Sequence, residues 1–96
     1  MLTKCMALEW AKYNIQVNCI SPGAIESSMA RKLYNTSEKM DNRIKGIPLK
    51  KLVSMNSVIN TIVFLTSGDN DDITGTNIVI DGGSSISYFK LLSEII

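Results

Sequence analysis

Helical spacing of apolar residues is the first pattern along the chain. Residues 1–13 contain strong helix formers and neither glycine nor proline, which predicts a helix to about Tyr13. Its apolar side chains cover a wide arc: Leu2, Cys5, Met6, Leu8 and Trp10. Because a helix that is apolar over most of its circumference is buried on more than one side, we expect two packing surfaces here.

A strand-like pattern follows the predicted helix. Apolar side chains at Ile15, Val17, Cys19 and, out of phase, Ile20 indicate a short strand with at least one buried face. Ser21-Pro-Gly23 ends it abruptly, because proline has no N–H for a ladder and glycine lets another backbone or a ligand approach closely. Open parallel sheets bind ligands outside the carboxyl ends of their strands, so this strand end is a candidate site.

The second half of the chain continues the alternation of helix and strand. Residues 26–46 are mixed and polar, and loosely spaced apolar side chains predict one or two short helices: Met29, Leu33, Tyr34 and Met40. Ser54 is expected to cap a helix that runs to about Ser67, with a core-facing apolar stripe. The continuous run Ile78–Ile80 predicts a strand buried on both faces, which Asp81-Gly-Gly83 ends.

Two stretches of the sequence, residues 68–72 and the tail, each allow two interpretations. The carboxylates of residues 68–72 invite a calcium interpretation, but the glycine and glutamate positions of an EF-hand loop are not matched, which favours a solvated loop. In the tail, residues 84–96, apolar side chains are spaced for one face of a short helix: Ile86, Phe89, Leu92 and Ile96. Such a helix would dock on the body or on a second subunit, and a non-native sequence after a frameshift is the alternative.

Charge and composition argue against several classes of function. Ten basic and nine acidic residues leave a net charge of +1 without a basic block, which argues against nucleic-acid and acidic-membrane surfaces. The chain has no histidine, which removes Ser-His-Asp catalysis and most zinc sites, and we expect no metal site. No stretch approaches the ~18 apolar residues of a membrane span. Cys5 and Cys19, both in predicted apolar settings, indicate free thiols in a reducing compartment, so we expect a soluble cytoplasmic protein.

Several short motifs together resemble the C-terminal portion of a classical short-chain dehydrogenase/reductase, either 3-oxoacyl-ACP reductase-like or polyol dehydrogenase-like. They are Asn14-Ile-Gln-Val-Asn18, Ser21-Pro-Gly23 with a hydroxyl at Ser27, Ile73-Thr-Gly75 and Asp81-Gly-Gly83. The resemblance implies an α/β fold: the C-terminal part of a Rossmann-type three-layer α/β/α sandwich, with two parallel strands and about three to four helices. It assigns residues 1–83 to that domain and leaves residues 84–96 as an atypical tail.

The resemblance also implies a cofactor site at the first strand end. Pro22, Gly23 and the backbone around Ala24 and Ile25 would cradle the nicotinamide end of NAD or NADP, with backbone groups of Ile25 holding its carboxamide. The Ser27 hydroxyl stands where a threonine usually contacts the cofactor, and a helix N-cap is its alternative role. Residues 26–46 would form the lid over the substrate. Met29 would then face the substrate pocket, and hinge packing is its alternative.

Other parts of the family pattern are absent or altered in this sequence. The catalytic Tyr-x-x-x-Lys pair would lie just before Met1, and Lys4 and Tyr13 stand in the wrong order and place to replace it, so we expect no catalytic residue here. No Gly-rich loop is present, which leaves the adenine half of the cofactor without a site and the choice of NAD or NADP open. Lys50 stands where the family usually has a glycine, which puts a tight turn in doubt.

Two classes of function remain as hypotheses. The first is an NAD(P)-dependent oxidoreductase that transfers hydride between nicotinamide and a small-molecule alcohol or ketone, present here as a fragment. The alternative is a non-catalytic interaction module that pairs with a full-length relative, or a decayed or split gene product. The resemblance implies subunit contacts through helix 1–13 and strand 77–81, hence a homo-oligomer or a complex with such a relative, and no nucleic-acid or membrane partner.

Overall fold

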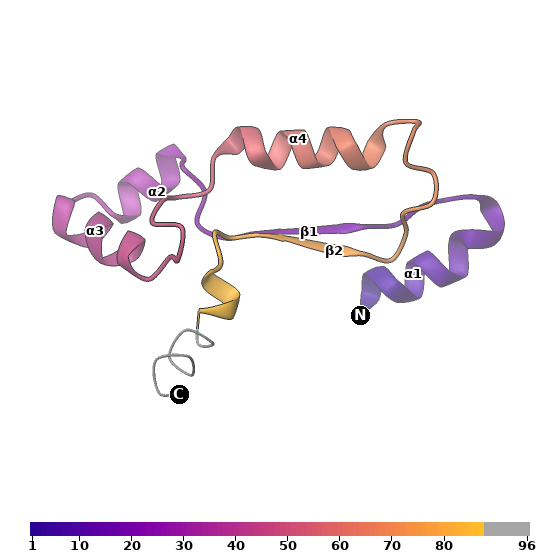
Figure 1. Ribbon diagram of the computed structural model, residues 1–96, viewed down its shortest axis with the longest axis horizontal. Coiled ribbons are helices and arrows are strands. Elements are labelled where there is room, and N and C mark those ends of the chain that lie inside the picture. The colour runs from indigo at the N-terminus through magenta and orange to yellow at the C-terminus, as the bar shows by residue number, and fades with distance from the viewer. Residues whose placement is uncertain (88–96) are drawn as a thin grey trace.

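The computed structural model describes residues 1–87, which form four α-helices and two strands (Figure 1). Helix α1 spans Leu2–Trp10 and continues as a 3₁₀ turn over Ala11–Tyr13; strand β1 spans Cys19–Pro22; α2, α3 and α4 span Ser28–Leu33, Ser37–Lys45 and Met55–Thr66; and β2 spans Asn77–Ile80, followed by a 3₁₀ turn over Ser84–Ile86. This content confirms the predicted α/β class, and the stretch 26–46, for which one or two short helices were predicted, contains two. The tail helix expected through Phe89, Leu92 and Ile96 lies outside the described residues.

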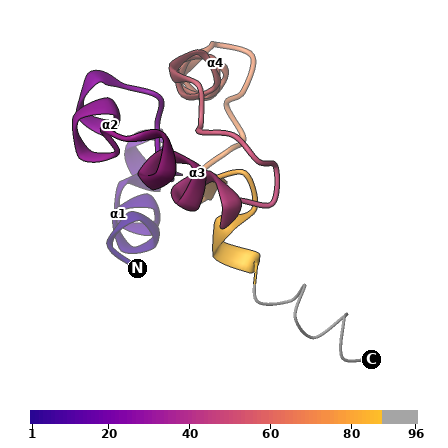
Figure 2. The same cartoon turned by 90° about the vertical axis from the view of Figure 1, so that its left-hand side faces the viewer.

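The two strands pair in parallel and form the middle layer. Cys19 stands opposite Asn77 and Pro22 opposite Ile80, so residues almost 60 positions apart are neighbours. Helix α4 lies over one face of this sheet and α1 lies on the other side, near the amino ends of the strands (Figures 1 and 2). Helices α2 and α3 lie beyond the carboxyl ends. The predicted parallel pairing and layer order are therefore present.

The first strand begins later than the sequence predicts and includes the proline. Residues 15–18 do not join the ladder because they bond to the turn that precedes β2: the Gly75 N–H donates to the Val17 carbonyl at 2.7 Å. The Asn18 side chain accepts from Thr76 N–H at 3.1 Å and donates to the Ile73 carbonyl at 3.0 Å. Pro22 is tolerated at the strand end because the next N–H, that of Gly23, makes the bond to Ile80 at 2.9 Å.

Two expectations about burial are wrong for the described residues. Val79, expected inside a strand covered on both faces, is 49% exposed, so no described element covers its side chain fully. Cys5 is exposed and Cys19 is half-buried, so the predicted apolar setting holds only in part for the second thiol. Both misses have one cause, since a sheet of two strands offers little surface for burial.

The best-packed part of the described chain is the excursion between the strands, residues 26–52, which we call the α2–α3 segment. Ala30, Ile47 and Leu52 form its buried centre, and four half-buried side chains pack around them: Ala24, Tyr34, Met40 and Ile44. A parallel bridge between Ile25 and Val53 closes the segment at its base. The described chain is nevertheless extended, with a radius of gyration of 16.9 Å, whereas a compact domain of about this length has about 12 Å.

Side-chain hydroxyls begin three of the helices. Ser27, Thr36 and Ser54 each accept a hydrogen bond from a backbone N–H in the first turn of α2, α3 and α4. The predicted cap at Ser54 is confirmed, and α4 ends at Thr66, one residue before the predicted end. No helix within residues 1–87 is long and apolar enough to cross a membrane.

Lys50 holds the left-handed backbone conformation that favours glycine, with φ of +58°. The turn in doubt at this position is therefore kept, although a lysine occupies it. The Lys50 ammonium donates to the Lys45 carbonyl at 2.7 Å, which places a positive charge at the carboxyl end of α3. This contact is exposed and offsets only part of the steric cost of the conformation.

The left-handed conformation of Lys50 predicts that glycine changes stability differently at Lys50 and at its neighbour Lys51. In Lys51→Gly, glycine only adds unfolded-state entropy, whereas in Lys50→Gly it also removes a steric cost of about 1–2 kcal/mol. We expect Lys50→Gly to be more stable than Lys51→Gly by about 1 kcal/mol in urea-unfolding measurements. Equal stabilities, or a less stable Lys50→Gly, would contradict the assigned backbone conformation.

Candidate functional site

The chain leaves the carboxyl end of β1 along Pro22–Ser27, where the sequence predicts the site. Gly23 continues the ladder, and a Cβ at this residue would lie 2.8 Å from the Asp81 Cβ. No such contact occurs between real Cβ atoms, so glycine is needed here for the close approach of the two strand ends. Of the two roles weighed for this glycine, the structure shows the approach of another backbone.

Ile25 presents a free donor and acceptor next to this approach. The Val53 N–H donates to the Ala24 carbonyl, and the Glu26 N–H donates to the Val53 carbonyl, both at 2.8 Å. In a parallel bridge of this kind, the residue between the two bonds directs its own N–H and C=O to the opposite side. No described residue bonds to either group of Ile25. The strand exit therefore offers one donor and one acceptor on the same extended residue.

Ser27 is the N-cap of α2, which confirms the alternative role named for its hydroxyl. Its oxygen accepts the Ala30 N–H at 3.2 Å, and its φ of −153° is extended, as an N-cap requires. A hydroxyl also carries a proton and a second lone pair. The capping bond thus leaves the Ser27 O–H available to donate.

Met29 follows on α2 and points away from the packed centre, with 78% of its surface exposed. Leu33, one turn further along the same helix, is exposed as well. Hinge packing, the alternative for Met29, is therefore not its role within the described residues; Met40 packs against the centre instead.

The two carboxylates nearest to the candidate site are both engaged. Glu26 accepts from Arg31 at 2.8 Å in an exposed ion pair. Asp81 accepts the N–H groups of Gly83 and Ser85, each at 2.9 Å. Hydrogen bonds from the side chain and backbone of Ser85, and from the backbone of Gly83, hold the pKa of Asp81 below its ordinary value. An ionised carboxylate that is fixed in a turn is a poor proton donor, so Asp81 has a structural role in this turn.

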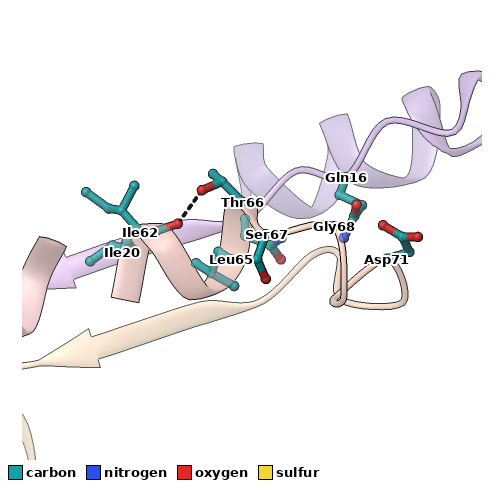
Figure 3. A pocket seen from close by; sticks show the side chains of 9 residues that line it. Gln16, Ile20, Ile62, Leu65, Thr66, Ser67, Gly68 and Asp71 are labelled. Atoms are coloured by element: carbon teal, nitrogen blue, oxygen red, sulfur yellow. Dashed lines mark hydrogen bonds between the residues drawn. The ribbon is translucent and has the colours of Figure 1, made fainter. Parts of the chain in front are cut away.

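A hollow of about 500 Å³ lies at the opposite end of the strands (Figure 3). Ile62 and Leu65 of α4 form one wall, and Gln16 and Asp71 lie at its polar end. The Gln16 amide donates to the Ile73 carbonyl at 2.9 Å, so it holds the turn rather than facing a ligand. None of the predicted site residues lines this hollow, and it brings no group of reactive side chains together.

The structure also shows contacts that the sequence analysis did not predict. Ile47 and Pro48 pack against Gly82 and Gly83, so the base of the α2–α3 segment meets the end of β2. The sequence analysis interpreted the Gly-Gly pair only as a strand end, because a glycine pair alone does not indicate which residues pack against it.

Comparisons with known proteins agree with this architecture. A family model described as enoyl-(acyl carrier protein) reductase matches residues 1–85. The 2,3-dihydro-2,3-dihydroxybenzoate dehydrogenase of Bacillus subtilis (strain 168) is 38% identical over 94 residues, which cover 90% of this chain and 36% of that protein.

Solved structures give the same result. A 4-hydroxyisoleucine dehydrogenase mutant complexed with NADH and succinate superimposes with a TM-score of 0.80 at 37% identity, over 88% of this chain and 35% of that one. An NADPH-dependent reductase involved in bacilysin biosynthesis superimposes with a TM-score of 0.80 at 30% identity, over 86% of this chain and 35% of that one. The chain therefore belongs to the short-chain dehydrogenase/reductase family of oxidoreductases, and it spans about a third of the length of these relatives.

The hydrogen bonds to Asp81 predict how its carboxyl titrates. A lowered pKa means that the contribution of Asp81 to stability is present above the unfolded-state pKa and is lost as the pH falls through the lowered, folded-state pKa. We expect the Asp81 side-chain ¹³C signal to titrate with a midpoint below the ordinary value of about 3.9. Ser85→Ala removes the side-chain bond and is expected to raise that midpoint. A midpoint at the ordinary value in the unmodified chain would contradict the assigned contacts.

Proposed function

We propose that this chain supplies the nicotinamide-side wall and the substrate lid of an NAD(P)-dependent oxidoreductase, which transfers hydride between the cofactor and an alcohol or ketone carbon. The observation that carries the proposal is the free N–H and C=O of Ile25 at the carboxyl end of a parallel strand. Ligands bind at such strand ends in open α/β sheets.

The residues present fit the nicotinamide end of the cofactor. A carboxamide has one carbonyl acceptor and one amino donor, and Ile25 offers the matching donor and acceptor. Pro22, Gly23 and Ala24 would form the adjacent backbone wall, and the Ser27 hydroxyl would donate while it caps α2. When bound, the nicotinamide accepts or gives the hydride. One similar structure holds NADH and one similar reductase is NADPH-dependent, so the chain is assigned NAD or NADP without a choice between them.

Proton transfer would come from outside these residues. Glu26 and Asp81 are both engaged, so neither is offered as the general acid. We infer that the Tyr-x-x-x-Lys pair and the Gly-rich loop, which the 96 residues lack, belong to polypeptide that completes the fold. The threefold greater length of the relatives supports this inference. Met29, exposed on α2, would contact the substrate from the lid.

Subunit contacts are proposed where apolar surface is left uncovered. Leu8 on α1 is 82% exposed and Val79 on β2 is 49% exposed, although both lie on elements that the sequence predicts to be buried. A second copy of this chain, or a full-length relative, would cover helix 1–13 and strand 77–81. We propose a cytoplasmic location, because two cysteines without a spaced framework do not suggest a secreted disulfide scaffold.

Amide NMR of the full chain with reduced nicotinamide mononucleotide tests the cofactor site. At millimolar ligand we expect shifts centred on Ile25, because its N–H and C=O would bond to the carboxamide, and no shifts there with adenosine monophosphate. Ser27→Gly keeps most of the helix cap and removes the hydroxyl, so it should weaken binding about threefold to tenfold. Ser28→Ala, one residue further on, is the matched control and should bind as the unmodified chain does.

Three outcomes would contradict the proposal. These are an undispersed amide spectrum, no shift at Ile25 with the nicotinamide ligand, or equal shifts with adenosine monophosphate. Sedimentation velocity on the same samples tests the subunit contacts. A species larger than 10.6 kDa supports them, and a monomer that also fails to bind a full-length relative contradicts them.

A further inference from the structure

The turn that ends β2, residues 81–83, is built from one carboxylate and two glycines in the left-handed region. Gly82 has φ of +64° and Gly83 of +94°. The Asp81 carboxylate accepts the N–H groups of Gly83 and Ser85, each at 2.9 Å, and so fixes both residues relative to the strand. The chain direction after β2 is therefore set by side-chain bonds as well as by glycine.

The base of the α2–α3 segment sits directly on this turn. A Cβ at Gly82 would lie 2.8 Å from the Ile47 Cγ2, and a Cβ at Gly83 would lie 3.0 Å from the Pro48 Cγ. The Leu49 N–H donates to the Gly82 carbonyl at 3.0 Å. Ile47 is only 2% exposed and belongs to the buried centre of the segment. Gly82 thus makes room for Ile47, on which the α2–α3 packing depends, and Gly83 makes room for Pro48.

The same turn touches the candidate nicotinamide segment from the other side. Asp81 lies so close to Gly23 that a Cβ on the glycine would be 2.8 Å from the Asp81 Cβ. The Gly23 N–H bonds to the Ile80 carbonyl, one residue before the turn. Close packing of this kind is not general for glycines of the described chain, because nothing lies within 4 Å of the Cβ position at Gly68.

We propose that Asp81-Gly82-Gly83 is a positioning joint, which sets the α2–α3 segment relative to Pro22–Ser27 by contacting both. The residues of the joint act through their contacts with Ile47, Pro48 and Gly23. The role in placing the lid against the cofactor rests on the proposed function, whereas the mechanical role does not. The joint predicts that loosening the turn releases the base of the α2–α3 segment while β1 and β2 stay paired.

Hydrogen exchange of backbone amides in the full chain tests the joint. Gly83→Ala introduces a Cβ against Pro48 at a left-handed residue, and we expect exchange at Leu49, Lys50 and Val53 to become about tenfold faster. Exchange at Cys19 and Gly23 should change less than about twofold, because these amides belong to the β1–β2 ladder. Gly68→Ala is the matched control, and it should leave both groups unchanged.

A second variant guards against general destabilisation by the strained alanine. Pro48→Ala removes the ring that packs against Gly83 without changing the turn at residues 81–83. It should produce the same pattern of faster amide exchange with a smaller amplitude. A uniform rise across both groups of amides in both variants, or no rise in either, would overturn the proposal. The exchange is measured without ligand, so failure of the proposed function would appear separately, as missing nicotinamide shifts with the exchange pattern intact.

Discussion

The parallel pairing of β1 with β2 is the interaction on which the rest of the structure depends. It joins two four-residue strands that are separated by more than 50 residues of chain. Asn18 holds the amino end of the pair through bonds to Ile73 and Thr76, and the contact of Gly23 with Asp81 closes the carboxyl end. Without this pairing, α4 and the α2–α3 segment would have no common surface.

The position of the pairing explains why burial is so uneven. The α2–α3 segment has its own centre around Ile47 and meets the strand ends through Gly82 and Gly83, so it is well packed within the described chain. Helix α4 lies over only two strands, and apolar residues such as Ile62 and Val63 stay about half exposed. A two-stranded sheet is marginal by itself, which fits a chain that spans about a third of its relatives.

Local sequence signals predicted what depends on local physics. The Ser54 cap, the two helices between residues 26 and 46 and the strand at 77–80 follow from capping, spacing and β-branched runs. The start of β1 was missed because it is decided by bonds from Val17 and Asn18 to a turn far along the chain.

The candidate site, too, has a part that the sequence predicted and a part that only the fold shows. Its place at the end of β1 could be predicted from Ser-Pro-Gly, but the free N–H and C=O of Ile25 depend on the bridge to Val53, which no pattern in the sequence indicated. The joint at Gly82 and Gly83 was hidden for the same reason. A glycine pair predicts permissive backbone, and only the fold shows which side chain uses the space.

The most direct test of this account compares two alanine substitutions at glycine. Urea unfolding of the full chain should show Gly23→Ala destabilised by about 1–3 kcal/mol, because the new Cβ must displace the backbone of Asp81. Gly68→Ala meets open space and should change the free energy of unfolding by less than about 0.5 kcal/mol. If the two variants are equally stable, the strand ends do not approach each other as described. That result would contradict the contact of Gly23 with Asp81, on which both the candidate site and the joint depend.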